Sequence, residues 1–249
     1  MKNLALAILF IASSFISTAQ DVSVDDIVEN YIENTGGREA WSKLEGFTMK
    51  AAVNMQGMEI PLEVIILKDG RTATIVTYQG MTFSQDVYDG EVLWGVNPMT
   101  MKAEKSESEK LENYKRGIGE FPNDLFLYKK SGFTLTLEGE DTKEGVECYK
   151  LKLIKNTQLV DGKETENIMY YYMDKESFVP IVVEQPIVSG PMAGQTSTTI
   201  MSDYQEVDGL YFAFSIMQEV DGMGGSEIVV TEVELNPTVD ESVFTFPGE

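Results

Sequence analysis

The side chains that could perform catalysis are few in kind, because this 249-residue chain has 41 acidic residues and no histidine. Histidine supplies the usual general base near neutral pH, the base of serine hydrolases and most zinc ligands. The sequence also lacks a G-x-S-x-G nucleophile elbow and a phosphate-binding P-loop. These absences argue against the common hydrolase, zinc-enzyme and nucleotide-binding classes, and they leave paired carboxylates as catalytic candidates.

Carboxylate pairs occur at 25–26, 138–141 and 240–241. Two carboxylates that meet in the fold could serve a glycosidase-like hydrolase or bind calcium, although no segment has the spacing of an EF-hand. No pair stands out, and in so acidic a chain the simpler interpretation of each is solvated surface. We therefore predict no catalytic residue, no metal and no cofactor, and keep a carboxylate-dependent hydrolase as a remote alternative.

Charge and cysteine content narrow the class of partner. The formal net charge of -22 should repel nucleic acid, so we expect no nucleic-acid partner. A single cysteine, Cys148, excludes an internal disulfide, and its place in a strand-like run predicts a small buried hydrophobe. Stability must therefore come from an apolar core, which the 43% of hydrophobic residues can build.

Methionine is the residue type that points to binding. The chain contains 13 of them, spread over both halves. Because the methionine side chain is flexible and polarisable, it suits surfaces that accept varied apolar ligands, although core packing is the simpler role for any one of them.

The first 20 residues have the features of a secretory signal. Lys2 gives a positive start, an apolar run follows, and small residues precede an expected cleavage after Ala19 or Gln20. The apolar run is too short for a membrane-spanning helix. We therefore expect residues 1–20 to be removed on export, and a periplasmic single domain over 21–249.

The remaining chain is predicted to be mainly β with a few helices. Helices are expected at 24–35 and 38–44, and one or two more within 104–130, where Pro122 breaks the pattern. About ten strands alternate apolar and polar residues, and Asp-Gly pairs between them indicate hairpins. A sheet with one apolar face must cover that face, and the helices are the only candidate covers.

Several stretches in order resemble the periplasmic lipoprotein-carrier superfamily with the LolA/LolB-like fold. They are the helix end at Thr35–Ala40, the Asp-Gly hairpins, the helical interruption after Trp94, and the segments Val207–Phe214 and Val233–Phe246. The resemblance implies a strongly curved antiparallel sheet forming an unclosed half-barrel, with helices as a lid over an apolar cavity. It also implies binding of lipid or lipoprotein acyl chains without a cofactor. Arg38, Arg71 and Arg116 are the only arginines, and none matches the lid-gating arginine of the true carrier, so general lipid binding is the broader prediction.

On this interpretation the protein is a monomeric carrier whose partners are acyl chains and, in the envelope, membrane proteins. Alternation along the strands predicts the cavity lining, although a slip of one residue would invert each face. The predicted lining residues are Met49, Val53, Met55, Leu62, Val64, Ile66, Trp94, Phe126, Tyr149, Leu151 and Leu153. A structural or interaction module of the envelope, with a core filled by its own side chains, would share the same sequence pattern and stays open as an alternative.

Overall fold

A computed structural model describes residues 22–247, except Gln56 and Gly222. The expected signal peptide and its cleavage site lie outside the described residues. Four helices and one short 3-10 helix accompany the strands. They are α1 (Val24–Asn34), α2 (Arg38–Ser42), α3 (Ser108–Gly117), α4 (Asp124–Ser131) and η1 (Glu241–Phe244). Within the described range, no helix is long and apolar enough to cross a membrane.

Thirteen strands form one antiparallel sheet, and two more form a separate hairpin of β9 (Gln158–Val160) and β10 (Lys163–Thr165). The sheet consists of β1 (Gly46–Met55), β2 (Met58–Leu67), β3 (Thr72–Tyr78), β4 (Met81–Tyr88), β5 (Leu93–Asn97), β6 (Lys102–Lys105), β7 (Thr134–Lys143), β8 (Val146–Ile154), β11 (Ile168–Asp174), β12 (Pro180–Pro186), β13 (Thr196–Val207), β14 (Leu210–Val220) and β15 (Met223–Leu235).

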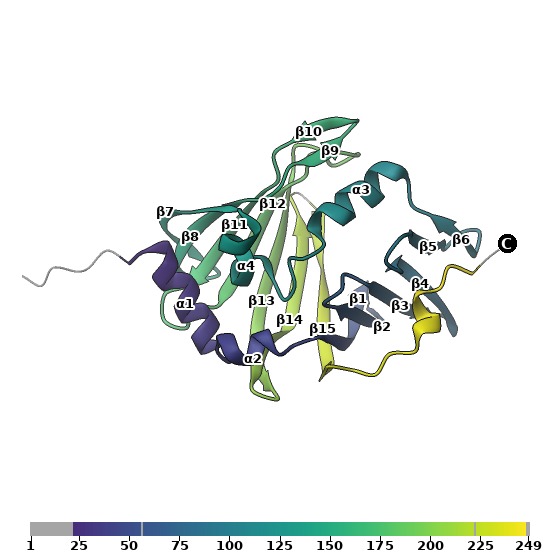
Figure 1. Cartoon of the computed structure of the whole chain (residues 1–249), viewed down its shortest axis with the longest axis horizontal. Helices are drawn as coiled ribbons and strands as arrows, with labels where there is room; N and C mark the ends of the chain where they lie inside the picture. Colours follow the sequence, from purple (N-terminus) through teal and green to yellow (C-terminus); the bar gives the residue numbers. More distant parts are fainter. Residues whose placement is uncertain (1–21, 56, 222, 248–249) are drawn as a thin grey trace, which may run out of the picture.

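The strand order is β6-β5-β4-β3-β2-β1-β15-β14-β13-β12-β11-β8-β7. The pairing of β1 with β15 joins the N-terminal and C-terminal hairpins into one surface. Among the described strands no pairing joins the edges β6 and β7, and the sheet curves around an open interior (Figure 1). The predicted mainly-β, unclosed half-barrel is therefore confirmed, with three more strands than the alternation indicated.

The helices α1 and α4 lie against the inner, concave face at the β7 side of the sheet, and α2 lies by β13 and β14, where Trp41 packs on Phe212 (Figure 1). The first of them begins with a capping box. The Ser23 hydroxyl accepts a hydrogen bond from the backbone N–H of Asp26, and the Asp26 carboxylate accepts one from the backbone N–H of Ser23. Its buried residues are Ile27, Val28, Tyr31 and Ile32, which recur at helical spacing and face the sheet. This amphipathic stripe is the reason that α1 docks where it does.

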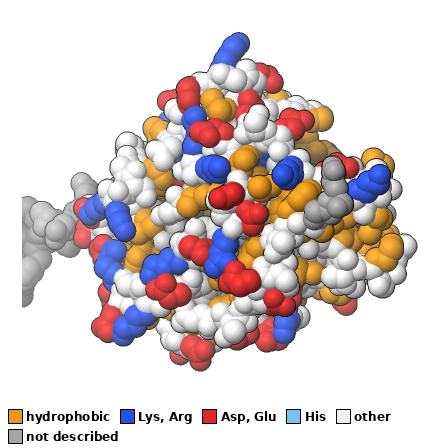
Figure 2. Space-filling view, turned by 45° about the vertical axis from the view of Figure 1, so that its right-hand side comes forward, with side chains coloured by type: hydrophobic (Ala, Val, Ile, Leu, Met, Phe, Trp, Pro, Cys, Tyr) orange, Lys and Arg blue, Asp and Glu red, His pale blue; other side chains and the backbone are white. Residues whose placement is uncertain are grey.

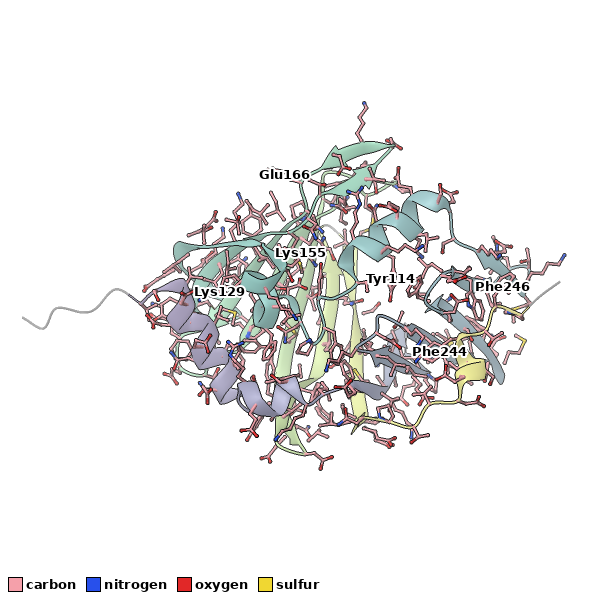
Figure 3. The ribbon with its side chains drawn as sticks, in the orientation of Figure 1. Tyr114, Lys129, Lys155, Glu166, Phe244 and Phe246 are labelled. Carbon is pink, nitrogen blue, oxygen red and sulfur yellow. The ribbon has the colours of Figure 1, made fainter. Side chains whose placement is uncertain are left out.

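A second core lies on the outer face of β2–β5, beneath the C-terminal segment. Phe244 in η1 is buried there against Ile65, Val87 and Trp94. The indole Nε1 of Trp94 donates a hydrogen bond to the carbonyl oxygen of Phe244 at 3.0 Å. Phe244 and Phe246 thus hold the chain end against the outside of the half-barrel (Figure 3).

Candidate functional site

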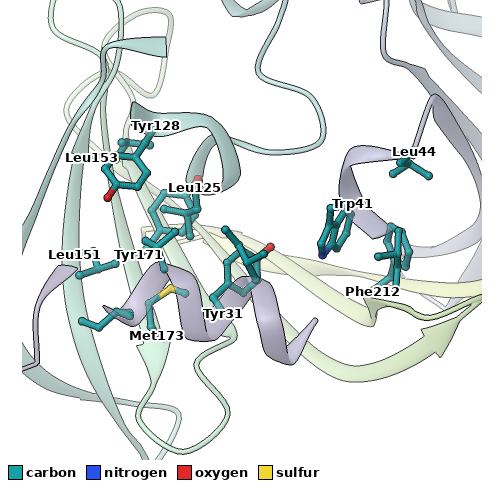
Figure 4. Packing of buried hydrophobic residues seen from close by; sticks show 14 of the residues in the cluster. Tyr31, Trp41, Leu44, Leu125, Tyr128, Leu151, Leu153, Tyr171, Met173 and Phe212 are labelled. Carbon is teal, nitrogen blue, oxygen red and sulfur yellow. The ribbon is translucent and has the colours of Figure 1, made fainter. Parts of the chain in front are cut away.

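The inner face under α1 and α4 is filled by side chains. Leu151 and Leu153 on β8 are fully buried, and Tyr171 on β11 pairs directly with Leu151. Figure 4 shows these residues packed with Tyr31 of α1 and with Leu125 of α4. Because protein interiors of this kind are close-packed, this half of the face stabilises the fold.

The inner face continues beyond the helices, where its apolar residues are only partly buried. One row crosses five strands, since each residue is the direct cross-strand partner of the next. Its members are Ile60, Val53, Ile228, Ile216 and Met201. Partners in an antiparallel pair point to the same side, and Ile228 and Ile216 pack against the inner core, so the whole row faces inward. We name these five residues the inner row.

A second line of apolar residues lies next to the inner row, one step closer to the core. Leu62 pairs with Ala51 on one side and with Val76 on the other, and Val76 pairs with Phe83. Apolar side chains also reach the surface over the right-hand part of Figure 2, whereas charged side chains dominate its left and lower parts. The residues of the inner row and of this second line are therefore only partly buried, apart from Ala51, which is buried.

A pocket of about 370 Å³ lies at the other end of β2, where β2 leads into β3. Its walls include Ile66, Tyr114, Ile118 and Phe121. The ring of Phe121 stacks on Phe47, with centroids 6.3 Å apart, which fixes one wall to the inner face. The pocket thus has mixed apolar and polar walls, formed in large part by α3 and the segment between α3 and α4.

The helix α3 bridges two distant parts of the half-barrel through polar contacts. Asn113 exchanges two hydrogen bonds with the backbone of Leu159 in β9, at 2.8 and 2.7 Å. On the other side the ring of Tyr114 lies 4.7 Å from that of Tyr88 on β4, measured between centroids (Figure 3). None of the residues of α3 is buried. The helix is therefore attached to both sides without a core of its own.

A buried ion cluster lies between the pocket and the packed core. The Lys155 ammonium group pairs with the carboxylates of Glu120 and Asp124, the latter at 3.0 Å, and each of the three side chains is at most 17% exposed. Burial, with the neighbouring Asp124 carboxyl, raises the pKa of Glu120 to about 7. Although burial opposes the charged form, the two carboxylates keep the pKa of Lys155 above its ordinary value. The cluster ties β8 to the start of α4.

Most predicted lining residues of β1 and β2 lie on the inner face. Met49 and Leu62 pack at the border of the inner core, and Val64 is the cross-strand partner of Met49. Val53 belongs to the inner row, and Ile66 lines the pocket. Met55 ends β1, but its side chain lies outside the described part of the chain.

The predicted residues of the second half lie in the packed core. Leu151 and Leu153 are inaccessible, as described above. Tyr149 stacks on Phe178, with centroids 6.1 Å apart. Phe126 carries the Arg38 guanidinium group 5.0 Å above its ring. These residues face the same interior as the inner row, beneath the helices.

Trp94 does not join this set. It lies on the outer face, where it is 4% exposed under Phe244 and Phe246. The cause is one extra residue in β4. Thr72 on β3 pairs with Tyr88 and Thr74 pairs with Gln85, so a single residue of β3 lies opposite two residues of β4. The first of these two, Asp86, has a positive φ. Such a bulge inverts the alternation that follows, and Trp94 therefore points outward.

Ile60, Ile216, Ile228 and Met201 were not among the predicted residues. Each lies in a strand that the alternation predicted, but alternation alone allows its side chain to point either inward or outward. What was missing is the pairing of β1 with β15, which brings residues 53 and 228 together across 175 positions of sequence. The carboxylates at 25–26 and 240–241 instead serve as helix caps and ion pairs. Within the described part of the chain, no three His, Cys, Asp or Glu side chains gather as a metal site would require.

Comparison with solved structures gives the fold a name. A LolA superfamily protein from Nitrosomonas europaea superimposes with a TM-score of 0.54 at 14% identity, covering 90% of this chain and 98% of that one. A domain from Vibrio parahaemolyticus, described as an outer membrane lipoprotein-sorting protein, gives a TM-score of 0.53 at 12% identity, covering 89% and 95%. No family model and no curated protein matches the sequence. The chain has the LolA-like fold.

Proposed function

We propose that the protein is a non-catalytic carrier that binds the acyl chains of lipids or lipoproteins along the open part of its inner face. The observation that carries the proposal is the inner row, a continuous apolar line across five strands that remains partly exposed. A small domain rarely leaves so much apolar surface open on a concave face unless a ligand covers it.

The chemistry of this surface fits an unbranched hydrocarbon better than a polar ligand. The inner row and the line beside it contain no charged side chain. An acyl chain that buries a dozen methylene groups there would gain about 10 kcal/mol from leaving water, at roughly 0.8 kcal/mol for each group. After the cost of association, affinities in the micromolar range are expected.

The site also has a route of entry. Because α3 is attached by hydrogen bonds and a tyrosine pair rather than by a core, its displacement breaks few apolar contacts. We infer that α3 moves aside when a chain enters, while α1 and α4 remain in place on their packed core. The bound chain then lies along the inner row.

The likeness to a domain described as a lipoprotein-sorting protein supports a role in the cell envelope. We extend the proposal to an exported, periplasmic and monomeric protein, whose signal at 1–20 is removed and which transfers acyl chains to or from membrane proteins or membranes. The net charge of -22 supports a carrier that stays dispersed in an aqueous compartment.

Two alternatives make different demands on the structure. A structural module with a self-filled core is favoured by the packing under α1 and α4, but it leaves the inner row unexplained. A hydrolase would need free carboxylates beside a pocket. Glu120 and Asp124 do adjoin the pocket, yet both are paired with Lys155, which holds them as a structural ion cluster.

Two measurements on the same preparation test the proposal. Mass spectrometry of gently purified protein should find co-purifying lipid, and a fluorescent fatty-acid probe should bind with a dissociation constant in the micromolar range. Absence of lipid together with absence of probe binding would remove the carrier proposal and favour the self-filled module.

A further inference from the structure

The exposed methionines gather at one end of the sheet. Six of the large apolar side chains that are exposed in the described chain are methionines, with Met99 90% exposed and the others between 36% and 54%. Each lies in or directly beside a hairpin connection: Met58 after β1, Met81 after β3, Met99 and Met101 after β5, Met192 after β12 and Met223 after β14.

The topology places these five connections on the same end of the half-barrel. Successive antiparallel strands alternate direction, so the β1–β2, β3–β4 and β5–β6 turns share one end. Asn54 near the end of β1 pairs with Glu227 near the start of β15, which puts the β14–β15 turn beside the β1–β2 turn. The β12–β13 connection follows by the same alternation. We call these five connections the methionine rim.

Charge separates the methionine rim from the opposite end of the sheet. The stretches 54–58, 78–82, 97–101 and 186–201 contain no charged residue, and 220–226 contains only Asp221, whose carboxylate accepts a hydrogen bond from the backbone N–H of Thr196 at 3.0 Å. The turns at the opposite end each carry a carboxylate: Asp69, Asp89, Glu144, Asp174 and Asp208. In a chain of net charge -22 this difference needs a cause.

We propose that the methionine rim docks directly on the surface of a lipid bilayer. Tips from five separate turns are spread along an arc, which suits an extended fluid surface better than a single protein pocket. Methionine is unbranched and flexible, so it adapts to the disordered boundary between headgroups and acyl chains. The rim stretches listed above, whose single charged residue is Asp221, are also the part of this acidic molecule that a negatively charged membrane repels least.

The rim is continuous with the apolar inner face. Val53 of the inner row lies two residues before Met55, and Ile60 lies two residues after Met58, on the two sides of the β1–β2 turn. Ile228 lies five residues after Met223. A molecule docked by its rim would therefore open its inner face toward the membrane. The sixth connection at this end, 155–167, carries charged residues and is instead held by α3 through Arg116 and Glu164.

Flotation with protein-free vesicles tests the docking. The full chain is expressed and purified, so that any processing of its start occurs as in the cell, and it is mixed with vesicles of phosphatidylcholine alone or with added phosphatidylglycerol. We expect wild-type protein to float with both, more strongly with phosphatidylcholine, and we expect added salt to increase binding to the anionic vesicles. The triple substitution Met81→Ser, Met99→Ser and Met223→Ser should weaken binding at least tenfold.

Val229→Ser is the matched control, because Val229 is 43% exposed but lies within β15 rather than at a turn. It should float like wild type. Wild-type protein that fails to float, or a triple variant that floats equally well, would overturn the proposal, as would binding that requires native membranes with their proteins, which would indicate a protein partner. The triple variant should retain the fatty-acid probe, so failure of the rim and failure of the carrier proposal give different results.

Discussion

We expect the titration of Glu120 to make the free energy of unfolding depend on pH near neutrality, where a chain without histidine has few groups that titrate. Its carboxyl is at most 17% exposed beside Asp124 and Lys155, and its pKa is raised from 4.5 to about 7. A carboxyl whose pKa is raised by folding binds its proton more tightly in the folded protein. Its contribution is therefore fully present below the ordinary carboxyl pKa and is lost as the pH rises through 7.

The size of this effect follows from the shift. Raising the pKa of Glu120 from 4.5 to about 7 corresponds to about 3 kcal/mol, of which about 2.5 kcal/mol falls between pH 5 and pH 8. The chain has no histidine, so the residue type that usually titrates in this interval is missing. The free energy of unfolding, measured by urea denaturation, should thus fall by roughly 2 to 3 kcal/mol from pH 5 to pH 8.

Two variants isolate the cause. Glu120→Gln keeps the hydrogen-bonding shape of the protonated acid and should remove most of the pH dependence. Glu164→Gln is the matched control, because the Arg116 guanidinium, with Thr157, lowers the pKa of Glu164 to about 2, and its titration lies below this interval. An unchanged free energy of unfolding from pH 5 to pH 8 in wild type, or a full slope in Glu120→Gln, would refute the reasoning.

Two further predictions concern the fold. Trp94→Phe removes the indole donor to the Phe244 carbonyl and should lower the free energy of unfolding by about 1 to 3 kcal/mol, whereas a loss below about 0.5 kcal/mol would mean that the outer core does not depend on this bond. Gly36→Ala should cost more than about 2 kcal/mol, since its φ is +122° and an added Cβ would overlap the Gly209 carbonyl. Gly132→Ala, at the left-handed C-cap of α4 with no atom within 4 Å of an added Cβ, should cost only about 1 kcal/mol, and equal losses would contradict this account.

Local patterns in the sequence were enough to predict the elements of this fold. Ser23 and the apolar spacing after it indicated α1, and the Asp-Gly pairs at 161–162 and 208–209 indicated turns that the structure contains. The short charged strand β6 was not predicted, because Lys102–Lys105 has no apolar alternation to signal it. Helices and strands that pack an apolar face have an apolar periodicity in the sequence that predicts them, whereas an edge strand without such a face has none.

The site was less accessible than the fold for reasons that are also physical. Alternation gives two faces for each strand, but it does not say which face is inner, and a single bulge near Asp86 reversed the answer for Trp94. The contact of Val53 with Ile228 depends on a pairing between the two ends of the sheet, which no local pattern encodes. Likewise, the split between a packed and an open half of the inner face depends on where α1 and α4 dock.

The most direct test of the carrier proposal uses two neighbouring residues of β15. Ile228 belongs to the inner row, whereas Val229 points to the opposite face and is 43% exposed. Replacing either by asparagine changes the same strand by a similar volume and polarity, but only Ile228→Asn places an amide on the proposed acyl path. The account predicts that Ile228→Asn weakens binding of the fluorescent fatty-acid probe at least tenfold while Val229→Asn binds it as wild type does. Equal affinity of the two variants for the probe would contradict it.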